Sequence, residues 1–142
     1  MGDCPFCEIP INNRNRILYE DEEIIIFEDI NPMAYIHLQC IPKQHIKNIN
    51  SLTYNHVSLI KHMKDQSIKY IMEHYSGINE IDIIQGFHIP PFTSISHLHL
   101  HNIVPPFYNC LIKFCKVTCA MRNVNIVLNK IENEKPKLIV VA

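Results

Sequence analysis

Three histidines occupy alternate positions in the segment His97-Leu98-His99-Leu100-His101. Because side chains alternate across a strand, the three imidazoles would share one face, about 7 Å apart, while the two leucines face the core. Imidazole can serve as a neutral nucleophile, a proton donor or a metal ligand near neutral pH, since its reference pKa is about 6.5. A polar outer strand face is the alternative, but Lys, Glu and Thr are more usual there. We therefore favour a site for phosphoryl chemistry or zinc.

Two further groups could contribute to such a site. Thr93 and Ser94 precede the first histidine and could add hydroxyl donors. Cys4 and Cys7 have the Cys-x-x-Cys spacing of a zinc knuckle, but a knuckle needs two more ligands. Neither group is specific by itself.

The composition is that of a folded protein with one domain. The 142 residues are 47% hydrophobic and 19% charged, and the formal net charge is -1. No apolar run reaches the roughly 18 residues of a membrane span, and the N-terminus does not resemble a signal peptide. Residues 107–142 hold six Lys and Arg against two Asp and Glu, which we interpret as a solvated helix face. We expect a cytoplasmic or nuclear protein that binds neither membrane nor nucleic acid.

The hydrophobic pattern predicts the elements that would position these residues. β-Branched and aromatic runs predict strands over 17–20, 24–27, 36–41, 81–87 and 98–104, the last ending at Pro105. Apolar residues at three- and four-residue spacing predict a long helix between Ser51 and Gly77 and a second from Phe107 onward. Residues 138–141 could form a late strand. The fold class is α+β: an antiparallel sheet of about five strands, with helices on one face.

Three separated motifs resemble one known family. Residues 94–103 resemble the signature of the histidine triad (HIT) superfamily, and residues 27–32 and 37–45 resemble a strand and loop of its Hint branch. Residues 86–92, Gly-Phe-His-Ile-Pro-Pro-Phe, resemble a loop of the Hint subgroup that begins with Cys-x-x-Cys. The resemblance covers residues 4 to about 104 of a single HIT domain, 1–142, and leaves 105–142 as a C-terminal extension.

The resemblance implies a nucleotide-binding hydrolase or transferase that acts at the α-phosphorus of a nucleoside monophosphate. His99 would be the nucleophile, held by the backbone carbonyl of His97, and would form a nucleotidyl-histidine intermediate. His101 and Ser94 would contact the phosphate oxygens. His37 would move a proton to the leaving amine, with a buried structural histidine as the alternative.

The same resemblance implies a nucleoside pocket and a metal site. Phe6, Ile9, Phe27 and Ile30 would hold a purine nucleoside, and Asp29 would accept hydrogen bonds from the ribose, although the apolar residues would equally suit a core. The metal ligands would be Cys4, Cys7, His45 and His97. Because two cysteines and two histidines close a tetrahedron, the zinc would be structural and no catalytic metal is expected.

The remaining histidines and cysteines fit no such pattern. His56, His62, His74 and His88 are expected to have surface or supporting roles. Cys40, Cys110, Cys115 and Cys119 are expected to fill the core. Gly86 stands where many Hint proteins carry Asn, so one contact to ribose or phosphate is missing or replaced.

Three hypotheses follow. The first is an adenosine 5′-monophosphoramidase-like hydrolase that acts on compounds of the AMP-NH2 and AMP-lysine type. The second is an aprataxin-like hydrolase of adenylated DNA 5′ ends, a class that also carries a C-terminal zinc finger and a basic surface. The third is a nucleotide-binding scaffold with a mainly regulatory role. The resemblance also implies a homodimer.

Overall fold

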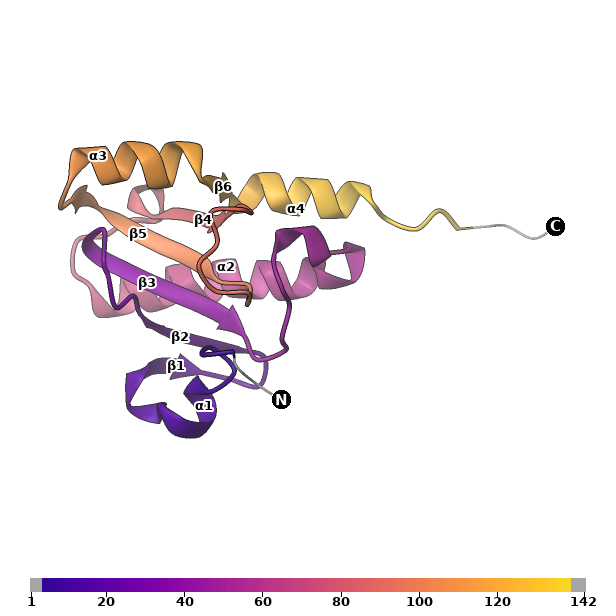
Figure 1. Ribbon diagram of the computed structural model, residues 1–142, viewed down its shortest axis with the longest axis horizontal. Helices are drawn as coiled ribbons and strands as arrows, with labels where there is room; N and C mark the ends of the chain where they lie inside the picture. The colour runs from indigo at the N-terminus through magenta and orange to yellow at the C-terminus, as the bar shows by residue number, and fades with distance from the viewer. Residues whose placement is uncertain (1–3, 139–142) are drawn as a thin grey trace.

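Six strands form one antiparallel sheet in the order β1-β2-β3-β5-β4-β6 in the computed structural model, which describes residues 4–138 (Figure 1). The strands are β1 (Ile17–Glu20), β2 (Ile24–Glu28), β3 (Ala34–Pro42), β4 (Ile84–His88), β5 (Leu100–Phe107) and β6 (Met121–Asn123). The helices are α1 (Ile9–Asn12), α2 (Val57–His74), α3 (Cys110–Ile112), which continues into the π-helical segment η5 (Lys113–Cys119), and α4 (Val124–Asn133). Short 3₁₀ turns are η1 (Arg14–Arg16), η2 (Ile49–Ser51), η3 (Tyr54–His56) and η4 (Glu80–Asp82).

One face of the sheet is covered by α2 and α4. Figure 1 shows α2 running behind the strands, and α4 following β6. Alternate residues of the central strands, such as Leu38 and Cys40, point to this face and join the inner sides of both helices in the main core. Leu98 and Leu100 lie in the same core. Because side chains alternate, His97, His99 and His101 point to the opposite face of the sheet.

The opposite face is covered only in part. At one end Phe6 and Ile9 pack against Ile25 and Phe27 of β2. At the other end Met33, Ala34 and Ile103 form a small cluster against which Val117 of η5 packs. The sheet between these two patches is left open to a cavity, because neither patch reaches across it.

The antiparallel α+β fold with a long helix and a C-terminal helix is confirmed, and the sheet gains one strand, β6, beyond the five expected. The long helix begins at Val57, after the turns η2 and η3. None of the described helices is long and apolar enough to cross a bilayer.

Two expectations about strands were wrong. β5 does not stop at Pro105 but runs through Pro105 and Pro106 to Phe107. The prolines are tolerated because the register with β3 shifts between Ala34 and Ile36, and because the pairing with β4 reaches only to Ile103. Residues 81–82 form part of the turn η4, so β4 begins later than expected.

The C-terminal extension also differs from the expected amphipathic helix. Residues 110–119 are helical, but the chain then extends into β6 before α4 begins. Cys110, Cys115 and Cys119 are exposed instead of filling the core, whereas Val117 of η5 packs inward. Cys40 is buried as expected. Of the late strand expected over 138–141, residues 139–141 lie outside the described residues.

Candidate functional site

A cavity of about 260 Å³ lies on the open face of the sheet. Its walls come from the N-terminal segment, β2 and the turn after it, β3, the segment before β5, and η5. The lining residues that matter most below are Phe6, Arg16, Asp29, His37, His88, Ser94, His99, His101 and Lys116.

His99 stands in an extended segment just before β5. The neighbouring Leu98 N–H donates to the Ile46 carbonyl at 2.7 Å, which fixes this segment against the loop after β3. His99 Nδ1 lies 2.6 Å from the His97 carbonyl oxygen and must donate to it, so the neutral ring carries its lone pair on Nε2. Burial lowers the pKa of His99. The hydrogen bond to the His97 carbonyl and the charge of the Asp29 carboxylate raise it, but by less than burial lowers it. The ring is thus a neutral imidazole with a free nucleophilic nitrogen.

A chain of hydrogen bonds fixes the tautomers of His37 and His101. The Met33 backbone N–H donates to His37 Nδ1 at 3.0 Å, so the neutral ring of His37 carries its proton on Nε2. That Nε2–H donates to His101 Nδ1 at 2.8 Å, which places the His101 proton on Nε2. His101 Nε2 is buried and has no partner among the described residues. His101 therefore presents an unsatisfied donor, which a phosphate oxygen would satisfy.

His88 lines the cavity, although the sequence analysis gave it only a surface or supporting role. Its ring centroid lies 4.3 Å from that of His101, and its Nε2 is buried with no partner in the described chain. Burial, together with the charges of His99, His37 and Lys116, lowers the pKa of His88 to about 4. His88 is therefore neutral at physiological pH and adds a second unsatisfied nitrogen to the same wall.

Asp29 lies in the turn after β2, with its carboxylate at the edge of the cavity. Gln39 Nε2 donates to Asp29 Oδ2 at 2.5 Å, and the Asn31 backbone N–H donates to Oδ1 at 2.8 Å. His37 Nε2 lies 3.3 Å from Oδ2. These contacts hold the carboxylate rigidly while it still lines the cavity.

The structure brings most of the expected nucleoside residues to this cavity. Phe6, Phe27, Asp29, Ile30 and Ser94 line it, with the Phe6 and Phe27 rings edge to face at 5.3 Å. Two of the residues expected in the nucleoside pocket do not line this cavity. Ile9 is fully buried beneath the phenylalanines, because it faces the inside of α1, and Thr93 lines a small neighbouring recess.

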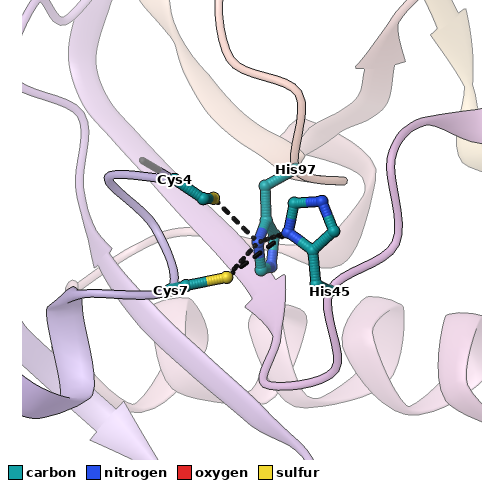
Figure 2. A group of neighbouring side chains, drawn as sticks. All are labelled: Cys4, Cys7, His45 and His97. Carbon is teal, nitrogen blue, oxygen red and sulfur yellow. Dashed lines mark hydrogen bonds between the residues drawn. The ribbon is translucent and has the colours of Figure 1, made fainter. Parts of the chain in front are cut away.

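The four expected metal ligands point toward one another, as Figure 2 shows, and their ligand atoms all lie within 4.8 Å of one another. His97 Nδ1 lies 3.4 Å from Cys4 Sγ, 3.5 Å from Cys7 Sγ and 3.2 Å from His45 Nδ1. Tetrahedral zinc with bonds of about 2.0 to 2.3 Å would separate its nitrogen and sulfur ligands by roughly 3.3 to 3.8 Å. His97 Nε2 donates to the Pro42 carbonyl at 2.8 Å, which leaves Nδ1 free to bind a metal. The donor set and its spacing fit zinc.

The comparisons with known proteins agree with this geometry. A family model described as "Scavenger mRNA decapping enzyme C-term binding" matches residues 3–114. A solved HIT family hydrolase from Legionella pneumophila superposes with a TM-score of 0.65 at 26% identity, over 76% of this chain and 97% of that one. The chain belongs to the histidine triad superfamily.

Curated relatives place this HIT domain near the Hint proteins. It is 38% identical to the adenosine 5′-monophosphoramidase HINT3 of Xenopus tropicalis over 104 aligned residues. These residues are 72% of this chain and 67% of the relative. It is 39% identical over 108 residues to the bifunctional adenosine 5′-phosphosulfate phosphorylase/adenylylsulfatase HINT4 of Arabidopsis thaliana, covering 73% and 71%. The aprataxin of Danio rerio is 31% identical over 90 residues, which are 63% of this chain and 27% of that protein. The chain spans about two thirds of the length of the HINT3 relatives.

Sequence reasoning missed three ionisable residues that line the cavity of this HIT domain. His88 had a usable signal, because it lies two residues after Gly86, which pairs with His101 across β4 and β5 and shares its face. Arg16, which lies over the Phe27 ring at 5.1 Å, and Lys116 had none, since tertiary contacts alone bring them to the cavity.

Proposed function

We propose that the chain is a nucleotide-binding hydrolase that cleaves the bond between the α-phosphorus and the leaving group of purine nucleoside 5′-phosphoramidates. The observation that carries this proposal is the bond from His99 Nδ1 to the His97 carbonyl, which directs the lone pair of His99 to Nε2. The unpartnered His101 Nε2–H beside it supplies a donor for the phosphoryl oxygens. The relatives named adenosine 5′-monophosphoramidase support the choice of substrate.

The reaction would take two displacements. In the first, the His99 Nε2 lone pair forms a P–N bond, the bond from phosphorus to the leaving amine breaks, and the amine keeps the electron pair and takes a proton from solvent. In the second, water attacks the same phosphorus, the electron pair returns to His99 Nε2, and the water proton passes to solvent. His101 Nε2–H would donate to a phosphoryl oxygen in both transition states.

We assign His37 a positioning role. Both of its ring nitrogens are engaged, one by the Met33 N–H and the other by His101 and Asp29. His37 would hold His101 in the tautomer that donates to phosphate, which differs from the direct proton transfer expected from the family resemblance. At the other end of the cavity, Phe6, Phe27 and Ile30 would hold the nucleoside.

Replacement of His99 by Ala tests the proposal. Turnover of adenosine 5′-monophosphoramidate should fall by several orders of magnitude while thermal unfolding stays cooperative, and the exposed His74→Ala variant on α2 should keep full activity. A brief incubation of the native protein with substrate, followed by acid quench and mass spectrometry, should trap a nucleotidyl adduct on His99. Activity retained by His99→Ala would refute the mechanism, and a binding scaffold would form no adduct.

We also propose that Cys4, Cys7, His45 and His97 hold a structural zinc ion. When bound, such an ion completes a closed tetrahedron and ties the N-terminal segment and the loop after β3 to the catalytic segment. His97 would link the two sites, because its ring binds the metal and its carbonyl holds His99.

A homodimer and a cytoplasmic or nuclear location stay proposals. The outer edge of β4 is paired with β6, so two sheets would join through β1 or the three residues of β6. Light scattering on the purified protein would decide the oligomeric state.

A second candidate, hydrolysis of adenylated DNA 5′ ends, is favoured by the aprataxin relative. Binding to a nicked, adenylated duplex that is tight at low salt and falls steeply with added salt would support it, and binding no stronger than to the unadenylated duplex would oppose it.

A further inference from the structure

The C-terminal extension brings a cation to the cavity. After β5 the chain forms α3 and η5, which run beside β5 (Figure 1), and Lys116 of η5 lines the cavity. Val117 packs against Met33 and Ile103, and the Ala120 carbonyl accepts a bond from the Ile89 N–H at 2.9 Å. Lys116 lies between these anchors and lines the cavity. Contacts of the neighbouring residues Val117 and Ala120 therefore hold the backbone near Lys116 in place.

Lys116 lies at the phosphate end of the cavity. The pKa values of His37, His88 and His101 are lowered mainly by burial. The positive charge of Lys116 lowers all three further. Among the described side chains no carboxylate forms an ion pair with Lys116. Lys116 is an exposed residue and can therefore meet a ligand.

The other cation of the cavity lies elsewhere. The Arg16 guanidinium lies over the Phe27 ring, at the end where the apolar residues would hold the nucleoside. Of these two lining cations, Lys116 is the one whose charge acts on His37, His88 and His101. It is placed to interact with the phosphoryl oxygens or with the group that leaves.

The charge of the leaving group decides what such a cation does. An amine leaves with a proton, and a lysyl amine also carries its own ammonium or carboxylate groups. A sulfate or phosphate leaves as an oxyanion: His99 Nε2 forms the P–N bond, the P–O bond breaks, and the oxygen keeps the electron pair without needing a proton. A fixed ammonium stabilises that developing negative charge and repels an approaching cation.

We propose that Lys116 makes this chain selective for adenylates whose leaving group departs as a small oxyanion, sulfate or phosphate, over those that release a cationic amine. The proposal rests on the proposed function, because it uses the same attack by His99, and it extends that attack from phosphoramidates to adenylates with an oxyanion leaving group. It assigns a specificity role to the extension after residue 105.

Kinetics with two substrates test the proposal. Adenosine 5′-phosphosulfate and AMP-lysine should be compared in the native protein, in Lys116→Met, and in Lys130→Met, whose lysine lies on α4 away from this cavity. Lys116→Met should lower kcat/KM for the phosphosulfate about tenfold and raise it for AMP-lysine, and Lys130→Met should change neither. A structural defect would lower both values together, so the opposite signs identify an electrostatic role.

Binding in the His99→Ala background separates the two proposals. Lys116→Met should weaken the Kd of adenosine 5′-phosphosulfate there by about tenfold without any turnover. If the native protein turns over neither substrate, the proposed function fails, while this binding difference still decides the role of Lys116. Equal changes for both substrates, or an unchanged Kd, would overturn the role of Lys116. Replacing the phosphosulfate by ADP in the binding arm distinguishes a phosphate from a sulfate preference.

Discussion

Gly86→Ala should loosen the C-terminal extension from the sheet. A Cβ at this position of β4 would lie 2.5 Å from Met121 Cγ, 2.7 Å from its Sδ and 2.8 Å from the Arg122 carbonyl oxygen. The methionine side chain can rotate away, but the carbonyl belongs to β6, whose Asn123 pairs directly with Gly86. The oxygen would be about 0.6 Å closer than ordinary van der Waals contact, so β6 must shift.

Overpacking of this kind costs about 1 to 3 kcal/mol, which for a chain of this size lowers Tm by roughly 4 to 10 °C. Thermal unfolding followed by circular dichroism measures the change. Because only Ala120 separates η5 from β6, the same variant should also reduce the preference for the phosphosulfate that we attribute to Lys116.

Gly77→Ala is the matched control. Gly77 has a φ of 76° and nothing within 4 Å of an added Cβ, so this variant should lower stability through backbone strain alone and leave the substrate preference unchanged. A Tm for Gly86→Ala within about 1 °C of the native value would show that β6 does not pack on β4 as described.

Three further predictions concern the metal, the pH and the core. Cys7→Ser, or treatment with a strong chelator, should remove about one equivalent of zinc and lower Tm, as measured by atomic absorption and thermal unfolding; a native protein without zinc would contradict the site. His88 has a pKa of about 4 in the fold against its ordinary 6.5, so the unfolded chain binds a proton in this window and stability must fall as pH drops from 6.5 toward 4. His88→Gln should therefore reduce the slope of Tm against pH there, and an unchanged slope would mean that His88 is not buried. Phe87→Ala should cost about 3 to 5 kcal/mol in urea unfolding, because the ring is almost fully buried in the main core; a loss below 1 kcal/mol would indicate that the core re-forms around the gap.

Local sequence determined the part of the site that depends on spacing alone. The two-residue period of an extended segment puts His97, His99 and His101 opposite Leu98 and Leu100, and the leucines do lie in the core. His97 nevertheless turns to the metal ligands, while the other two line the cavity. Alternation fixes the face of a side chain, but its neighbours determine what the side chain does there.

Motif resemblance reached further, because it carries pairings between distant segments. It brought Cys4, Cys7 and His45 to His97, a grouping that the Cys-x-x-Cys spacing alone left incomplete. The resemblance ends near residue 104, so it predicted no structure for the C-terminal extension that follows. There the apolar period predicted one continuous helix, and the pairing of β6 with β4 overrode that local preference.

The sequence by itself determined the antiparallel strands, the long helix and the shared face of the histidines, because these follow from periods of two and 3.6 residues. Only the tertiary structure decided which nitrogen of His99 and of His101 is free, since each tautomer is set by a hydrogen bond to the partner that folding supplies. Only the tertiary structure placed Lys116 beside these rings, because contacts between residues far apart along the chain have no local pattern that announces them.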